Sequence, residues 1–306
     1  MSRNPFFSRK SPGGVLAIES SDVGTGSRFY VDSVGGLSTN SGTGPDDALA
    51  TVDAAIAKCT ANKGDIIYVL PTHAETASTD VELFDVDVAG VSIIGLGQGD
   101  QRPTFTITHA DATVVLGASS CRLSNLRFVA NVTDVVTIIE VEAAAVGNTI
   151  EGCYFTDSGS ALDALTMISV EADADRLTII DNHFNGFIGG EATDCIILAG
   201  GSDGAVIARN IGYGDWKTGG FINASTAASL GILILDNVIT NADAAAGLCY
   251  LGHADNTGLI ARNMFQGNKA NTEPISELTA MHVNQNYMTD AVNASGIISA
   301  TVTAWT

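Results

Sequence analysis

The chain has 306 residues, with 34 acidic and 14 basic side chains and a net charge of −20. A chain this acidic repels phosphate backbones, which argues against a nucleic-acid partner. No run of about 18 apolar residues occurs, and no apolar run of about 7 to 15 residues follows the basic start, so we expect neither a membrane span nor a signal peptide.

Residues 1–27 are expected to form an extended docking arm, because they contain no periodic pattern of apolar residues. The first ten residues include no acid, and their basic and aromatic side chains could dock on an acidic partner. A contact with nucleic acid or a solvated, frayed terminus are the alternatives. The candidate docking residues are Arg3, Phe6, Phe7, Arg9 and Lys10.

Residues 28–65 are predicted to form a strand, a glycine-rich loop and a capping helix. The segment 28–33 has the pattern of a strand, and the loop spans 34–44. A helix is predicted within 45–65, because Pro45 is a start signal and Gly64 a stop signal. Its apolar face would cover the first turn of a repeat and consists of Leu49, Val52, Ile56 and Cys59.

Residues 66–306 contain a repeated segment. Its copies begin with a branched apolar residue and start 23 to 29 residues apart, at Leu123, Ile150, Ile179, Ile207, Ile234, Ile260 and Val283. Segments at 67–71 and 94–99 extend the series to about nine turns. Strands of about five residues at this spacing, without a helical pattern between them, predict an all-β fold. We therefore expect a right-handed parallel β-helix of about nine rungs.

Two columns of polar residues support this register. An amide recurs three places into the segment, at Asn182, Asn210, Asn237, Asn263 and Asn286. If successive turns lie about 4.8 Å apart, these side chains form a ladder whose members both donate and accept hydrogen bonds. The preceding column alternates acid and base, at Asp181, Arg209, Asp236 and Arg262. Opposite charges on neighbouring turns favour this register.

The five cysteines show no zinc-ligand or redox spacing, and four lie within or beside apolar runs. We interpret them as reduced core residues, which implies folding in a reducing cytosol. At the other end, residues 295–306 are predicted to form one or two strands that cover the last turn or pair with another subunit.

The run from Arg28 through "SGTGPDDALATVDAAIAK" to "GDIIYVLPTHAET" resembles the N-terminal segment of pectate-lyase-like β-helix proteins found in many tailed phages. The resemblance covers about residues 28–290. It implies a virion part, and the same fold also serves lyases, hydrolases and adhesins. Tailspikes usually add a particle-binding domain and a C-terminal domain, and this chain departs from that pattern. The departure favours a capsid decoration protein.

No catalytic or cofactor-binding residue is firmly predicted. Glu142 and Glu171 are expected to stack on adjacent turns, which makes them candidates for a catalytic pair or, with Asp173, for a cation site. A solvated acidic edge is the alternative. Asp181 and Asp236 have the two-turn spacing of an inverting glycosidase pair, but Arg209 between them should keep both ionised. Trp216, in a glycine-rich loop, could touch a sugar or a partner, or it could be packed.

The sequence therefore predicts a structural virion protein, without a cofactor. We expect a phage capsid decoration (cement) protein, made in the host cytoplasm and placed on the particle surface as a homotrimer that contacts the major capsid protein or other virion proteins. A short tailspike that binds and cleaves a host surface glycan, as a polysaccharide lyase or glycoside hydrolase, is the alternative. A secreted adhesin or lyase is a third hypothesis, which the expected absence of a signal peptide weakens.

Overall fold

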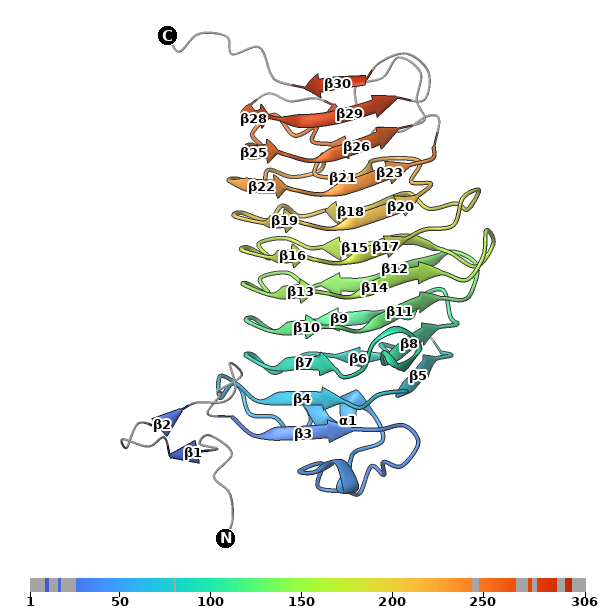
Figure 1. Cartoon of the computed structure of the whole chain (residues 1–306), viewed down its shortest axis with the longest axis vertical. Helices are drawn as coiled ribbons and strands as arrows, with labels where there is room; N and C mark the ends of the chain where they lie inside the picture. The colour runs from blue at the N-terminus through green and yellow to red at the C-terminus, as the bar shows by residue number, and fades with distance from the viewer. Residues whose placement is uncertain are drawn as a thin grey trace.

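The computed structural model describes residues 9–10, 16–17, 26–79, 81–243, 248–267, 275–276, 280–290 and 295–298. Within them the chain winds into a right-handed parallel β-helix (Figure 1). Three sheets run along the molecule, and each turn contributes one strand to each sheet in the order sheet 1, sheet 2, sheet 3. The predicted fold class is confirmed, with about eight turns instead of nine.

The strands of the three sheets follow one another at regular intervals. Sheet 1 contains β3 (Arg28–Val31), β4 (Ile66–Val69), β7 (Ser92–Gly95), β10 (Arg122–Ser124), β13 (Thr149–Glu151), β16 (Thr178–Ile180), β19 (Val206–Ala208), β22 (Ile232–Leu235), β25 (Thr257–Ala261) and β28 (Ala280–Asn284). Sheet 2 contains β5 (Ala74–Ala77), β8 (Thr104–Ile107), β11 (Arg127–Ala130), β14 (Tyr154–Asp157), β17 (His183–Asn185), β20 (Ile211–Gly214), β23 (Val238–Asn241), β26 (Met264–Gly267), β29 (Asn286–Asp290) and β30 (Ser295–Ile298). Sheet 3 contains β6 (Phe84–Asp85), β9 (Val114–Leu116), β12 (Val135–Val141), β15 (Ala164–Val170), β18 (Asp194–Leu198), β21 (Gly220–Asn223), β24 (Cys249–Tyr250) and β27 (Ile275–Ser276).

The N-terminal helix is much shorter than predicted. Only α1 (Val52–Ile56) is α-helical, and Pro45–Asp47 form a separate 3-10 turn, η1. The predicted start at Pro45 is wrong because Leu49 is extended and pairs with β3, with its N–H donating to the Tyr30 carbonyl at 2.8 Å. The helix begins after Thr51, whose hydroxyl accepts from the Ala54 N–H. Val52 and Ile56 are buried and close the first turn.

The arm predicted for residues 1–27 falls mostly outside the described residues, including Arg3, Phe6 and Phe7. Its described parts are two short strands, β1 (Arg9–Lys10) and β2 (Leu16–Ala17), which pair antiparallel. At the other end, β30 pairs antiparallel with β29, so a final strand adds to the edge of sheet 2. None of the helices in the described ranges is long and apolar enough to cross a membrane.

The interior is filled by side chains that point inward from all three sheets. Aromatic rings from sheet 2 stack on successive turns, with 5.2 Å between the centroids of Phe128 and Phe155 and 4.7 Å between Phe155 and Phe184. Gly212 interrupts this column, and the ring of Phe221 from sheet 3 fills the space that a side chain there would occupy. Four of the five cysteines are buried, and all five thiols are free.

The amide column forms a continuous ladder at the bend between sheets 1 and 2. The Nδ2 atoms of Asn182, Asn210, Asn237 and Asn263 each donate to the Oδ1 atom of the Asn on the next turn, at 2.9 to 3.2 Å. Each Nδ2 also donates to a backbone carbonyl of the preceding turn. Because these amides are buried, every bond made here removes an otherwise costly unpaired polar group.

The residues that immediately precede the ladder positions form the bend between sheets 1 and 2. These residues all have φ between 52° and 59°, the left-handed conformation that side-chain-bearing residues rarely adopt. They are Asn125, Gly152, Asp181, Arg209, Asp236, Arg262 and Gln285. Arg209 binds Asp181 through two hydrogen bonds, and Arg262 binds Asp236 in the same way. The acids and bases therefore pair two by two along an exposed edge.

Candidate functional site

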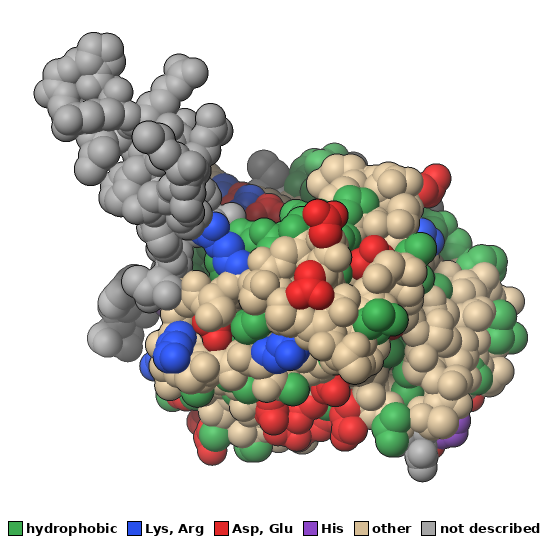
Figure 2. Space-filling view, turned by 90° about the horizontal axis from the view of Figure 1, so that it is seen from below, with side chains coloured by type: hydrophobic (Ala, Val, Ile, Leu, Met, Phe, Trp, Pro, Cys, Tyr) green, Lys and Arg blue, Asp and Glu red, His purple; other side chains and the backbone are tan. Residues whose placement is uncertain are grey.

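An acidic surface covers the outer face of sheet 3 near the N-terminal end. The register aligns Asp85, Val115 and Glu140 on three successive turns. Asp85 and Glu142 lie on either side of Gly117, since a Cβ atom there would be 2.9 Å from Asp85 Oδ1 and 3.0 Å from Glu142 Oε2. In the view of this end of the molecule, Asp and Glu side chains gather along one side (Figure 2).

The predicted pair Glu142 and Glu171 lies on this surface. Glu142 and Glu171 each follow one of the paired residues Val141 and Val170, so they stack on adjacent turns. With Glu140 they line one shallow hollow, whereas Asp173 lines a separate hollow beside Asp175. No group of three or more His, Cys, Asp or Glu side chains is placed to hold a metal ion in the part of the chain that the structure describes.

The acidic surface raises the pKa of its members. Burial, followed by repulsion from Asp87 and Glu142, raises the pKa of Asp85 to about 6. Burial and then Glu171 and Glu142 raise the pKa of Glu140. Asp85 Oδ1 is also buried without a hydrogen-bond partner. A carboxyl group in this state can hold a proton near neutral pH, which is what a general acid needs, and it also attracts any cationic group that approaches.

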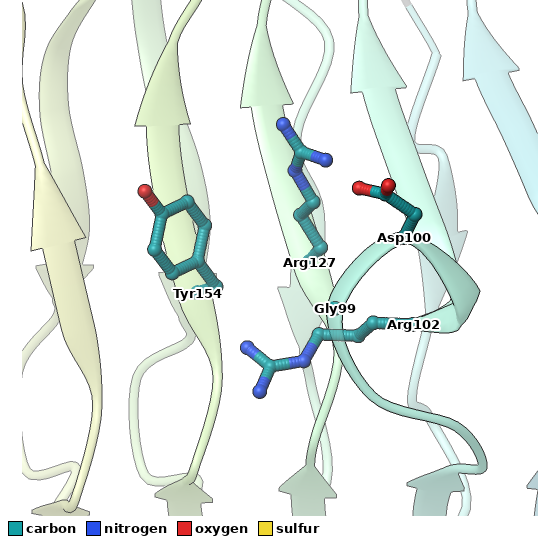
Figure 3. A pocket seen from close by; sticks show the side chains of 5 residues that line it. All are labelled: Gly99, Asp100, Arg102, Arg127 and Tyr154. Carbon is teal, nitrogen blue, oxygen red and sulfur yellow. The ribbon is translucent and has the colours of Figure 1, made fainter.

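A second hollow, of about 280 Å³, lies over the outer face of sheet 2 (Figure 3). It is lined by Arg127 on β11, Tyr154 on β14 and a segment around η2 (Gly99–Gln101) that contributes Asp100 and is followed by Arg102. The two guanidinium groups point to opposite sides of the hollow, with the Tyr154 ring on the neighbouring strand (Figure 3). The Nε atoms of both arginines are buried without a hydrogen-bond partner.

Neither arginine of this hollow forms a salt bridge with any residue that the structure describes. Arg127 Cζ lies 5.8 Å from the centroid of the Tyr154 ring. His183, on the next turn, packs edge-on against Tyr154 with 5.2 Å between ring centroids, and burial followed by Arg102 lowers its pKa. On a chain of charge −20, this hollow brings together two guanidinium groups and one carboxylate, so its own charge is positive.

Beyond this hollow the outer face of sheet 2 becomes apolar. Ile211, Val238, Met264 and Tyr287 occupy one column on four successive turns. Their exposed fractions are 42 to 52%. The corner between sheets 2 and 3 is also apolar, with exposed side chains at Val81, Val136, Leu162, Phe187 and Ile188. Sheet 2 therefore presents a basic hollow followed by a stripe of apolar side chains.

The apolar column on the outer face of sheet 2 was not predicted, although the sequence contains a pattern that indicates it. The inward Phe column is visible in the sequence, and strand residues alternate between faces, so the residue before each member points outward. Trp216, considered for sugar binding, is fully buried and packs edge-on against Phe221. It cannot contact a sugar, because the turn that carries it folds over the core, where Asn241 bonds both its N–H and its carbonyl.

Comparisons with known proteins give similarity of fold alone. No family model and no curated protein matches the chain. Among solved structures, a rhamnogalacturonan lyase has a TM-score of 0.45 at 13% identity, over 85% of this chain and 87% of that one. A GH136 lacto-N-biosidase from Eubacterium ramulus has a TM-score of 0.31 at 12% identity, over 86% and 67%. Neither similarity is close enough to carry an argument about this chain.

Proposed function

We propose that the protein is a structural component of a larger assembly, a decoration protein on the surface of a bacteriophage particle. The observation that carries this proposal is the apolar column of Ile211, Val238, Met264 and Tyr287. Single exposed apolar side chains are normal on soluble proteins, whereas a contiguous row marks an association surface. Because the strands beneath the row are hydrogen-bonded along the whole helix, the surface is held in a fixed shape suited to a permanent partner.

The viral part of the proposal draws on the sequence resemblance of about residues 28–290. In this proposal residues 1–27 dock on the major capsid protein or another virion protein, through Arg3, Phe6, Phe7, Arg9 and Lys10. The protein is made in the host cytoplasm, and its β-helices stand side by side on the particle as a homotrimer. The basic arm and the acidic body carry opposite charges, which orients docking on an acidic partner surface.

Co-sedimentation with particles that lack this protein tests the proposal. Full-length chain should bind heads saturably, and a chain without residues 1–27 should not. A second variant, Arg9→Glu with Lys10→Glu, tests the basic charge without shortening the chain. If full-length protein binds neither heads nor tails, the proposal fails.

The acidic surface of sheet 3 supports a second candidate, a tail-associated depolymerase that binds a host surface glycan. Asp85 and Glu140 are two turns apart, hence about 9–10 Å, which suits a carboxylate pair with a water between them. Asp85, with its pKa of about 6, would donate the proton to the leaving oxygen. Glycan cleavage that is abolished by Asp85→Asn, by Glu140→Gln or by Glu142→Ala with Glu171→Ala supports this candidate, and unchanged cleavage by all of these variants excludes it.

A further inference from the structure

Exposed apolar side chains are concentrated on one part of the molecule. The structure describes thirteen large apolar side chains as exposed, and ten of them lie on the outer face of sheet 2 or on the corner between sheets 2 and 3. The other three are Val34, Leu37 and Leu230. This distribution indicates that a partner covers sheet 2 and the adjoining corner.

Sheets 2 and 3 both carry their outward-facing charges in the N-terminal half of the column and uncharged side chains beyond it. Going from the N-terminal to the C-terminal end, the outer column of sheet 2 contains Ala74, Thr104, Arg127, Tyr154, His183, Ile211, Val238, Met264 and Tyr287. The outer column of sheet 3 contains Asp85, Val115, Glu140, Ser169, Ile197, Asn223 and Tyr250. In the first column the arginine lies on the third turn and the last four residues are apolar, and in the second column the acids lie on the first and third turns and the rest are neutral.

The two columns are also level with each other. Arg127 on β11 and Glu140 on β12 belong to the same turn, and so do Val238 on β23 and Tyr250 on β24. Two copies that stand side by side with parallel axes therefore bring basic side chains opposite acidic ones and apolar side chains opposite neutral ones. Antiparallel copies would instead set the apolar column of sheet 2 against the acids of sheet 3.

The geometry points to a second copy of this chain as the partner of sheet 2, with the sheet 2 face of one copy lying against the sheet 3 face of the next. This inference rests on the proposed assembly role and names the surface and the partner. Arg102 and Arg127 of one copy face Asp85, Glu140 and Glu142 of its neighbour. The corner between the sheets, with Val136, Leu162 and Phe187, lies at the centre of the assembly.

Such a contact pairs charges that form no salt bridge in a single copy. Among the described residues, neither Arg102 and Arg127 nor Asp85 has a salt-bridge partner. Bringing guanidinium groups to carboxylates gives charge-assisted hydrogen bonds, which are stronger than bonds between neutral groups. Because the contact joins two different faces, it is heterologous, and copies related by a rotation about the long axis close into a ring.

Sedimentation equilibrium of the full-length chain over a range of concentrations tests this inference. The wild-type chain should form a closed oligomer of parallel copies. Reversing one face, with Arg102→Glu and Arg127→Glu, or the other, with Glu140→Arg and Glu142→Arg, should each weaken association by about 10-fold or more. All four changes in one chain should restore it to within about threefold of the wild type, because the charges then match again in exchanged places.

The control variant carries Lys58→Glu and Lys63→Glu, which alter the net charge as much as the arginine pair does but lie in the loop after α1. It should associate as the wild type does. A wild-type chain that stays monomeric, single-face variants that associate normally, or a variant with all four changes that associates no better than its parents would each overturn the inference. A monomer that still binds particles through residues 1–27 would leave the proposed decoration role standing and would remove only its homotrimer.

Discussion

Asn182 and Asn210 lie one above the other on successive turns, and Nδ2 of Asn182 donates to Oδ1 of Asn210 at 3.2 Å. The backbone N–H of Asn182 donates to the same oxygen at 3.0 Å. The Asn210 amide thus accepts hydrogen bonds from the backbone and the side chain of the Asn on the neighbouring turn. Repetition of this unit ties the register of each turn to the next, which sets the level at which the outer faces of the molecule carry their charges.

Removing one amide from the ladder should destabilise the fold strongly. Asn237→Ala removes the acceptor of the buried Asn210 N–H and the hydrogen bond that Asn237 Nδ2 donates to the Ile207 carbonyl. We expect a loss of about 2–4 kcal/mol, measured from the denaturant midpoint. The control is Asn185→Ala, whose half-buried amide makes one long bond to Thr156 and should cost less than about 1 kcal/mol. Equal losses would show that the ladder does not stabilise the bend.

Much of this architecture could be predicted from the sequence, because every turn of a solenoid must place the same kinds of side chain at the same positions. The Asn column and the inward Phe column are visible as periodic residues, and the structure places both where the period requires. The start of the helix could not be predicted in the same way because Leu49, although at helical spacing from Val52, pairs with β3 instead. The hollow lined by Arg102 and Arg127 could not be predicted from the sequence. Arg102 belongs to no repeated column and enters the hollow from the segment after η2.

Backbone strain at the bend should appear when a branched residue is placed there. Asp236 has a φ of 55°, where a β-branched side chain clashes with its own backbone. Asp236→Val should be less stable than Asp236→Gly by about 1–2 kcal/mol. Both changes remove the carboxylate that binds Arg262, so their difference in melting temperature reports the backbone alone. Equal melting temperatures would mean that the bend relaxes without cost.

Asp85 should make the stability depend on pH. Its pKa is about 6 in the folded chain, against 3.8 for an aspartate in an unfolded chain, so folding favours the protonated form. The stability from this protonation is complete below pH about 4 and is lost as the pH rises to about 6. Asp85→Asn should therefore be more stable than wild type at pH 7, by less than about 1 kcal/mol because solvent screens the site.

The difference between wild type and Asp85→Asn should vanish near pH 4. Thermal melting between pH 4 and 7 measures it, with the exposed Asp46→Asn as a control of equal charge. A difference that is constant with pH would contradict the assignment of this shift to Asp85.

Placing a charge in the apolar column should weaken association without unfolding the chain. Val238 is 45% exposed, so Val238→Asp creates no buried charge in a single copy but puts one inside the proposed contact. We expect about 10-fold weaker association and an unchanged circular dichroism spectrum. Val34→Asp makes the same change at an exposed residue outside sheet 2 and should associate as the wild type does. If both variants behave alike, the column is not part of an interface.

Hydroxyl-radical footprinting tests most directly whether sheet 2 is the assembly surface. The reactivity of Met264 and Tyr287 would be compared between dilute protein and protein assembled on particles or with itself, with Val34 and Leu37 as reference positions. We predict that assembly protects Met264 and Tyr287 several-fold while Val34 and Leu37 stay reactive. Equal reactivity of Met264 and Tyr287 in the dilute and assembled states would contradict it.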